Sequence, residues 1–516
     1  MAVRTFAAID VGSYELAMKI FEFNSKGGMK QIDHIRHRLD LGTDTYHNGK
    51  ISGEKMDELC RILSEYVRIM NGYKVDAYKA YGTSAIREIK NGLIVREQIK
   101  QRTGIDLGVL SNSEQRFLHY KAVASKGRQF DDFINKGTAI ADVGGGSIQI
   151  SLFDEKKLMT TQNMRLGILR LQDMMDTLQP RMKDHDQILD ELIDNQLYFF
   201  KRHHLKGKDI ENIILIDDYI SVAIEHINPD TRTITAASFK EAAKFVKSMS
   251  IEDIAKRFEI PEETAQLMIP EMALLSRIMK ITKASTIWCP GVDLSDGIAY
   301  EYAESEKLLT NTHDFDNDII AAAGFISKRY NGNKDRNQLV ENVAMNLFDA
   351  TKKLHQLGKR DRLLLRIAAI LGDCGRYMSL EQSAECSYEI IMANEMIGLS
   401  HTEREIVANV VRFNKVHFEY YEELTKRHML DHDTYLRIAK LTALFRVADG
   451  ICRSHRPKIS GVKMNLKDEE LVISVDSTES IALEQGFFSR KSNLFEEMFA
   501  VKCRLKYKKK SAANQL

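Results

Sequence analysis

The chain has 516 residues, more than one ordinary hydrophobic core holds, which predicts two to four domains. A formal net charge of +1, with 44% hydrophobic and 28% charged residues, is typical of a soluble globular protein and gives no global mark of a DNA or membrane binder. The six scattered cysteines form no Cys-x-x-Cys pair. With no signal peptide and no apolar run of 18 residues, they favour a cytoplasmic protein without a membrane span.

The first 75 residues begin with two apolar runs, Thr5–Asp10 and Leu16–Phe23, on either side of a short turn. This arrangement predicts a β-hairpin. Apolar residues recur at three- and four-residue steps over 50–73, which predicts a helix.

Two further strand-to-helix units follow. A strand over 75–82 leads to Thr83 and Ser84, which are predicted to cap the next helix. The segment 107–125 then indicates a strand, a turn and a helix, with Ser111 or Ser113 as the N-cap.

Residues 138–158 repeat the opening order of strand, Asp-x-Gly turn and strand, about 130 residues further along the chain. We interpret 211–224 and 284–303 as buried strands with turns, and the sequence between them as helical. Within that helical part, 251–268 resembles a helix-turn-helix. Its turn is acidic, however, which suits a packed helical hairpin better than DNA binding.

The remainder of the chain changes character. From about Asp314 to about Arg456 the pattern predicts helices. The tail predicts strands over 462–476 and 500–510, the last ending in a basic run that is either a solvated tail or a patch for a polyanion. The expected order is α/β, α/β, all-α and a small α+β tail.

The two Asp-Gly turns are the candidate site. A glycine-rich turn exposes backbone N–H groups that can bind phosphate oxygens, and an aspartate beside it suits a cation between the carboxylate and the phosphate. The members of the two turns are Asp10, Gly12 and Ser13, then Asp142, Gly144, Gly145, Gly146 and Ser147. We expect them to face one another across a phosphate–metal unit, with positive φ at Gly145 and little cost to the fold when Asp142 is replaced. The alternative is that each turn is only a tight hairpin.

This pattern resembles the actin, Hsp70 and sugar-kinase superfamily and, within it, the Ppx/GppA phosphatases, which are exopolyphosphatases and guanosine pentaphosphate phosphohydrolases. The resemblance covers nearly the whole chain. It runs in order through AAIDVGSYELAMKIFEF, YGTSAIREIKNG, SNSEQRFLHYKAV, ADVGGGSIQISLF and RLGILRLQD. It implies two actin-like (ribonuclease H-like) lobes over 1–124 and 125–311, a helical HD-like domain over 312–460 and a small α+β segment over 461–516.

The resemblance also implies roles for individual residues. Asp10 and Asp142 would bind Mg²⁺, and the glycines and serines of both turns would bind phosphate. Arg87, in the Thr-Ser-x-x-Arg segment that begins at Thr83, would contact phosphate. Gly167 and Arg170 match a Gly-x-x-Arg element after the second turn.

The chain departs from the family pattern at both catalytic glutamates. Alignment of SGxEEARLxYxGV on Tyr120 places Gln115 at one of them, with Glu114 one residue earlier, and GGGSTEL places Gln149 at the other. A glutamate can accept the proton of the attacking water, whereas a glutamine can only orient that water. Glu114, Gln115, Gln149 and Asp142 are therefore the candidate catalytic residues.

Other departures are smaller. Tyr14 and Glu15 replace Asn and Ser in the first loop, where Glu15 could supply the missing charge, and 217–219 replaces a Gly-Gly-Thr loop. In the helical domain Gly372 stands before Asp373 where an HD enzyme has His-Asp. Asp449 survives, so we expect a degenerate metal site and a structural or substrate-guiding role.

The resemblance therefore predicts a Mg²⁺-dependent phosphatase that removes terminal phosphate from polyphosphate or guanosine pentaphosphate. The alternative is a polyphosphate- or nucleotide-binding sensor that has lost turnover. The sequence leaves the choice of substrate open and also the oligomeric state, for which a homodimer is the candidate.

Overall fold

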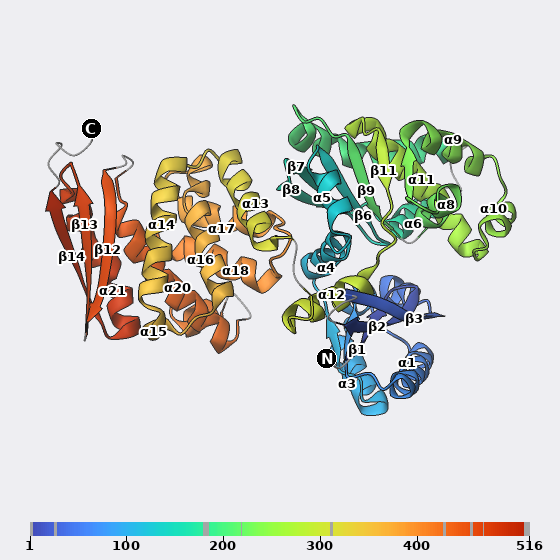
Figure 1. Ribbon diagram of the computed structural model, residues 1–516, viewed down its shortest axis with the longest axis horizontal. Coiled ribbons are helices and arrows are strands. Elements are labelled where there is room, and N and C mark those ends of the chain that lie inside the picture. The colour runs from blue at the N-terminus through green and yellow to red at the C-terminus, as the bar shows by residue number, and fades with distance from the viewer. Residues whose placement is uncertain are drawn as a thin grey trace. The chain divides into compact units, whose positions relative to one another are not determined.

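The computed structural model describes residues 4–24, 28–178, 185–217, 219–309, 313–426, 430–454, 458–467 and 469–509. The chain divides into two compact units, residues 1–315 and 316–516. Figure 1 shows two sheets in the first unit, and a helical bundle with a small sheet in the second. Among the described residues, no helix combines the length and the apolar character that crossing a bilayer requires.

The first sheet of unit 1 has the strand order β3-β2-β1-β4-β5, with β1, β2 and β3 antiparallel and β4 and β5 parallel to β1. Its strands are β1 (Arg4–Val11), β2 (Glu15–Asn24), β3 (Gly28–Arg38), β4 (Ala77–Gly82) and β5 (Leu107–Val109). The predicted hairpin of β1 and β2 is confirmed, with Val11 opposite Leu16 at its turn. The sequence analysis did not predict β3.

The second sheet of unit 1 repeats this order. Read from β8, it runs β8-β7-β6-β9-β11-β10, again with three antiparallel strands followed by parallel ones. Its strands are β6 (Thr138–Val143), β7 (Ile148–Asp154), β8 (Lys157–Met164), β9 (Asn212–Ile216), β10 (Thr233–Thr235) and β11 (Thr286–Trp288). The edge strand β10 is the exception, because it pairs with β11 in the antiparallel direction. The internal repeat predicted from the two Asp-Gly turns is therefore a repeat of sheet topology.

Helices cover both sheets of unit 1. The first sheet is followed or flanked by α1 (Gly53–Tyr73), α2 (Ser84–Arg87), α3 (Gly92–Thr103) and α4 (Asn112–Ala124). The second has α5 (Arg128–Ile134), α6 (Ile168–Leu178), α7 (His185–Phe200), α8 (Ile220–Ile227), α9 (Ala236–Lys247), α10 (Ile251–Phe258) and α11 (Glu262–Thr282). The helix α12 (Leu294–Ser305) packs on β1 and β2 of the first sheet. Two short π-helices complete the unit, η1 (Asp44–Asn48) and η3 (Lys201–Leu205).

Two strand predictions in unit 1 are wrong in their second halves. Residues 220–224 and 294–303 form helices α8 and α12 rather than strands. At α12 the reason is local, because Asp293 accepts a hydrogen bond from the Asp296 N–H and Asp296 accepts one from the Asp293 N–H. Such a capping box starts a helix even before an apolar run.

Helices α4 and α12 connect the two sheets of unit 1, and Figure 1 shows them between the blue and green strands. Leu118 of α4 and Ile298 of α12 share a core with Phe6 and Phe21 of the first sheet. Tyr120 of α4 contacts Phe153 of the second sheet, with ring centroids 5.5 Å apart. Side chains of α4 can therefore reach the second turn from the first half of the unit.

Unit 2 contains the predicted helices and the predicted tail strands. The helices are α13 (Phe315–Arg329), α14 (Lys334–Ala350), α15 (Lys352–His355), α16 (Lys359–Leu371), η4 (Cys374–Tyr377), α17 (Ser383–Ala393), α18 (His401–Phe413), α19 (Tyr421–Leu424), α20 (His432–Ile451) and α21 (Ala482–Phe499). The strands β12 (Ile459–Lys467), β13 (Glu470–Ser477) and β14 (Lys502–Lys509) form a sheet in that order. Leu471 and Ile473 of β13 belong to the same core as the helices, so bundle and sheet pack as one body.

Candidate functional site

The two Asp-Gly turns are built in the same way. Gly12 N donates to Glu15 O at 3.0 Å, and Gly144 N donates to Ser147 O at 3.0 Å. The N–H groups of Gly145 and Gly146 have no acceptor among the residues that the structure describes. Backbone N–H groups presented in this way can receive phosphate oxygens.

The first turn is fixed by neighbouring loops. Ser13 Oγ lies 2.9 Å from Ser84 Oγ and 3.2 Å from Tyr46 Oη, so three hydroxyl groups meet at this turn. Thr83 stands at the N-cap position of α2 as predicted, but its side chain makes no capping bond. The hydroxyl cluster, together with the hydrogen bond from Thr83 N to Val11 O, thus connects the first turn to the Thr-Ser-x-x-Arg segment.

Arg87 is directed toward the start of α4. Its Nη1 donates to Leu110 O and its Nη2 to Asn112 Oδ1, both at 2.6 Å, and burial lowers the pKa of its guanidinium. The guanidinium therefore holds the segment that leads into α4. Its contact with phosphate stays a prediction.

The helix α4 begins at Ser111, which confirms one of the two predicted N-caps. Glu114 completes a capping box, because its Oε2 accepts hydrogen bonds from Ser111 N at 2.9 Å and from Ser111 Oγ at 2.6 Å. A carboxylate that fixes a helix start in this way has a structural role. Gln115, the next residue, is half-buried at the same helix start.

Two residues of α4 that were not predicted from the sequence bind Asp142. Arg116 Nη1 donates to Asp142 O at 3.0 Å and to its Oδ1, while Arg116 Nη2 donates to Ser147 O at 3.0 Å. His119 Nδ1 lies 2.7 Å from Asp142 Oδ2. Residues 116 and 119 are three apart and lie on one face of a helix, which is the signal that could have found them.

The Arg116–Asp142–His119 cluster is charged, with Arg116 and Asp142 buried and His119 half-buried. Burial raises the pKa of Asp142, but Arg116 and His119 outweigh it and hold that pKa below its usual value. Burial lowers the pKa of His119, but Asp142, with a further contribution from Asp10, raises it above its usual value. His119 therefore interacts electrostatically with the aspartates of both turns, Asp10 and Asp142.

Asp142 does not fit the predicted role of a direct magnesium ligand. One of its carboxylate oxygens accepts from Arg116 and the other pairs with His119, so a cation would compete with a positively charged partner at either oxygen. Mg²⁺ binds through carboxylate oxygens and would meet positive charge here. The role of Asp10, which is half-buried at the end of β1, is a separate prediction.

The three glycines of the second turn differ in their surroundings. A Cβ on Gly145 would lie 2.7 Å from the end of the Leu169 side chain, whereas a Cβ on Gly146 would meet nothing within 4 Å. Gly145 is not among the residues with positive φ, so that expectation is wrong. Gly146 is therefore the glycine that faces open space.

The Gly-x-x-Arg element packs on this turn through its glycine. A Cβ on Gly167 would lie 2.3 Å from Gly145 O, so only glycine fits there. Arg170 is exposed, and its backbone N–H donates to Gly145 O at 3.2 Å. The element thus supports the turn through its backbone.

The remaining predicted residues are dispersed. Gln149 is buried and lies opposite Asp142 in the β6–β7 register. Glu15 pairs with Arg36 of β3 at 2.8 Å. Asp217 accepts from Ser221 N at 2.9 Å at the start of α8, and Asp218 lies outside the described residues.

In unit 2, an arginine joins the two aspartates of the predicted degenerate metal site. Arg336 Nη1 donates to Asp373 Oδ2 at 2.9 Å, and its Nη2 donates to Asp449 Oδ1. Lys491 Nζ lies 2.9 Å from Asp449 Oδ2. These aspartates are thus neutralised by side chains of unit 2 itself.

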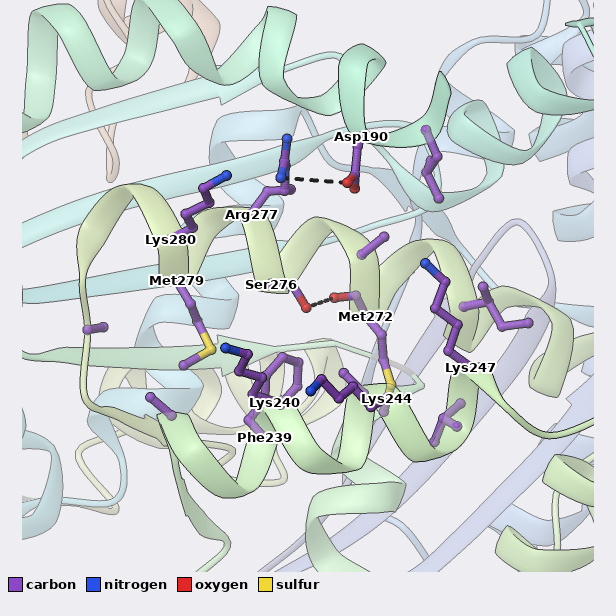
Figure 2. A pocket seen from close by; sticks show the side chains of 17 residues that line it. Asp190, Phe239, Lys240, Lys244, Lys247, Met272, Ser276, Arg277, Met279 and Lys280 are labelled. Atoms are coloured by element: carbon purple, nitrogen blue, oxygen red, sulfur yellow. Dashed lines mark hydrogen bonds and ion pairs between the residues drawn. The ribbon is translucent and has the colours of Figure 1, made fainter. Parts of the chain in front are cut away.

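A pocket of about 760 Å³ lies among α7, α9 and α11. Figure 2 shows Lys240 and Lys244 of α9 opposite Lys280 of α11, with Phe239 and Met272 among the apolar side chains of the lining. None of its lining residues belongs to either Asp-Gly turn. It is a separate feature of the helices beside the second sheet.

Comparison with known proteins identifies two matching family models. One is described as the Ppx/GppA phosphatase family and matches residues 20–306, and the other as Ppx/GppA phosphatase, domain III, and matches residues 321–492. A guanosine-5'-triphosphate,3'-diphosphate pyrophosphatase of Photobacterium profundum is 18% identical, over 92% of this chain and 93% of its own. An exopolyphosphatase 1 of Mycobacterium leprae is 23% identical, over 58% of this chain and 89% of its own.

Among solved structures, the Aquifex aeolicus member of the Ppx/GppA protein family aligns with a TM-score of 0.51. It is 20% identical and covers 61% of this chain and all of its own. At this identity the likeness concerns the fold.

Proposed function

Because the chain belongs to the Ppx/GppA phosphatase family, we propose that it hydrolyses the terminal phosphoanhydride of a polyphosphate chain, carried by inorganic polyphosphate or by guanosine pentaphosphate. The names of the relatives point to the same two substrates. The observation that carries the proposal is the pair of equivalent turns, in one compact unit, with N–H groups of the second turn that meet no acceptor in the described part of the chain. Two actin-like lobes in residues 1–311 and an HD-like origin of the helical region belong to the same proposal.

Substrate binding would use both turns. The N–H groups of Gly145 and Gly146 would receive oxygens of one phosphate, and the hydroxyl cluster around Ser13 would contact the other side of the chain. Arg116 neutralises Asp142, so the second turn does not repel an incoming polyanion.

Hydrolysis would depend on positioning and electrostatics. The transition state of phosphoryl transfer spreads negative charge over the transferred group, which fixed cations and N–H groups stabilise. Here His119 is a cation that the raised pKa favours, and it pairs with Asp142 at the end of the strand that leads into the second turn. Gln115 or Gln149 would orient the attacking water, since Glu114 is engaged in its capping box.

Magnesium dependence is a prediction for Asp10 alone. The chemistry that Mg²⁺ would supply is neutralisation of phosphate charge. At the second turn Arg116 and His119 already provide positive charge beside Asp142.

A second candidate function is a sensor that binds the same phosphate chain without turnover. Two observations favour it. The Glu114 carboxylate accepts hydrogen bonds from Ser111, and Gln115 and Gln149 stand at the two positions where the family has glutamate. A protein of this kind would bind the same ligands and release phosphate at a negligible rate.

The test is phosphate release from long-chain polyphosphate and from guanosine pentaphosphate, with Mg²⁺ and with a chelator. Binding of the same ligands is measured in parallel, and Gly146→Ala is the site control. Release that Gly146→Ala abolishes would support the enzyme, and tight binding without release would support the sensor. If the protein showed no binding and no phosphate release, both the enzyme and the sensor proposals would be contradicted.

A further inference from the structure

The second unit contains a pocket of about 650 Å³ with an excess of positive charge. It lies among η4, the start of α17, the loop after α18, and helices α20 and α21. Two carboxylates, Glu381 and Glu497, are among its lining residues. Its basic lining residues include Arg376, Lys415, Arg446, Arg453, Arg490 and Lys491. We call this the arginine-rich pocket, and its volume is in the range of small-molecule sites.

A buried ammonium group lies in the lining. Lys415 Nζ is buried, and within the described part of the chain it has no hydrogen-bond partner. Burial lowers the pKa of Lys415, although Asp373 acts in the opposite direction. Because a buried charge without a hydrogen-bond partner is costly, an anion in the pocket would satisfy this group.

Two further cations hold the loop that carries Lys415. Arg446 Nη2 donates to Val416 O at 2.6 Å, and Lys491 Nζ donates to Asn414 O at 2.6 Å. Burial lowers the pKa of both side chains, and the nearby positive charge of Arg490 further lowers that of Arg446. Like charges are thus gathered around the loop, which is the arrangement that an anion stabilises.

The neighbouring carboxylates do not remove this excess. Asp449, which lies behind Lys491, also accepts from Arg336 and has Arg453 Nη1 3.7 Å away. Glu497 Oε1 accepts a hydrogen bond from Tyr420 Oη at 2.8 Å. Clustered arginines and lysines of this kind suit linked phosphate groups, which carry several charges in a small volume.

The rim of the pocket is aromatic. Phe487 is 39% exposed, and the guanidinium carbon of Arg453 lies 5.2 Å from its ring centroid. Tyr420 is also exposed. Aromatic rings and arginine planes on a rim are surfaces on which nucleobases stack.

We propose that the arginine-rich pocket binds a short chain of linked phosphates through Lys415, Arg446 and Lys491, and that the base of a nucleoside triphosphate stacks on Phe487. The pocket is formed by unit 2 alone and contains no residue of the glycine turns. The proposal is therefore independent of turnover at those turns. It gives unit 2 the role of an effector site.

The first test is isothermal titration of the full chain with tripolyphosphate and with adenosine triphosphate, in the presence of a chelator. Lys415→Met should weaken binding at one site by about tenfold or more, since it removes a charge-assisted contact. Lys463→Met removes an exposed lysine of β12 outside the pocket and is the matched control. If circular dichroism shows both variants to be folded and they bind the two probes with equal affinity, the proposed binding site is wrong.

The second test separates phosphate from base. Phe487→Ala should weaken the binding of adenosine triphosphate by about fivefold or more and leave the binding of tripolyphosphate unchanged, because only the nucleotide has a base that can stack. An equal effect on both probes would overturn the role of the ring. Each titration is repeated on Gly146→Val, so that binding lost at the glycine turns is distinguished from binding lost at the pocket.

Discussion

His119 Nδ1 lies 2.7 Å from Asp142 Oδ2, and this pair joins helix α4 to the second glycine turn. Burial opposes the charge on His119, but Asp142 raises its pKa above the ordinary value, and the pKa of Asp142 is lowered in turn. The pair is therefore fully charged between the lowered pKa of Asp142 and the raised pKa of His119.

This pair predicts a pH dependence of stability. A raised folded pKa stabilises the protein below the imidazole's unfolded value of about 6.5, and the stabilisation is lost as pH rises through the folded pKa. The free energy of unfolding, measured by urea titration between pH 5 and pH 9, should therefore differ most between wild type and His119→Gln at the acid end. A difference that is constant across this range would show that folding does not shift the pKa of His119.

Replacing Arg116 should destabilise unit 1. Asp142 is buried, and removal of its guanidinium partner leaves a carboxylate that only His119 compensates. Breaking a buried pair in this way typically costs about 3–5 kcal/mol. Arg116→Met should show this loss in chemical denaturation, and Arg116→Met combined with Asp142→Asn should recover part of it. The expectation from sequence that Asp142 could be replaced at little cost is revised for the same reason.

The same variants address magnesium. In Arg116→Met the Asp142 carboxylate loses its strongest competitor for a cation, so Mg²⁺ should bind more tightly than in wild type. Arg116→Met with Asp142→Asn should not show this gain. The measurement is isothermal titration calorimetry with Mg²⁺. An affinity for Mg²⁺ that is the same in Arg116→Met and in wild type would contradict the idea that Arg116 competes with a metal for Asp142.

Gly146→Ala should weaken phosphate binding without harming the fold. The added methyl group meets no protein atom within 4 Å and lies beside the N–H groups of the turn. Gly145→Ala is the matched comparison. Its added methyl group would press on Leu169, so this variant should lose stability as well as phosphate affinity. Tripolyphosphate titrations and melting curves of both variants decide the matter, and wild-type affinity in Gly146→Ala would mean that the turn is only a hairpin.

The start of α4 yields a paired prediction. Glu114→Gln should cost less than about 1 kcal/mol of stability, because glutamine can also complete the capping box and only the charge at the helix start is lost, and it should leave any phosphate release nearly unchanged. Gln115→Glu should raise release by about 10²–10⁴-fold if that position holds the general base of the family. Release rates at saturating substrate are compared, and loss of activity in Glu114→Gln would instead identify Glu114 as the base.

What the sequence predicted well was local. The hairpin at residues 4–24 and the cap at Ser111 depend on residues within a few positions of one another, and the structure confirms both. The two turns were recognisable because each repeats Asp-x-Gly after an apolar strand. Short-range chemistry of this kind is written in the order of residues.

What the sequence did not predict depends on packing. Arg116 and Asp142 are 26 positions apart and meet because α4 lies against the second sheet. Residues 294–303 contain an apolar run that is compatible with a strand or a helix. The capping box of Asp293 and Asp296 favours the helix. The side of the turn that each glycine faces also depends on a distant residue, Leu169.

The basic run near the C-terminal end of the chain has a consequence for solubility. Residues 502–509 form β14, which pairs with β13 and is an outer strand of the described sheet. Exposed positive side chains alternate along it with half-buried ones, and the exposed residues are Lys502, Arg504, Lys506 and Lys508. Positive charges on an outer strand discourage other chains from adding to its unpaired N–H and C=O groups. Loss of β14 would expose β13, whose Leu471, Ile473 and Val475 are fully buried, and the protein would then aggregate through that new edge.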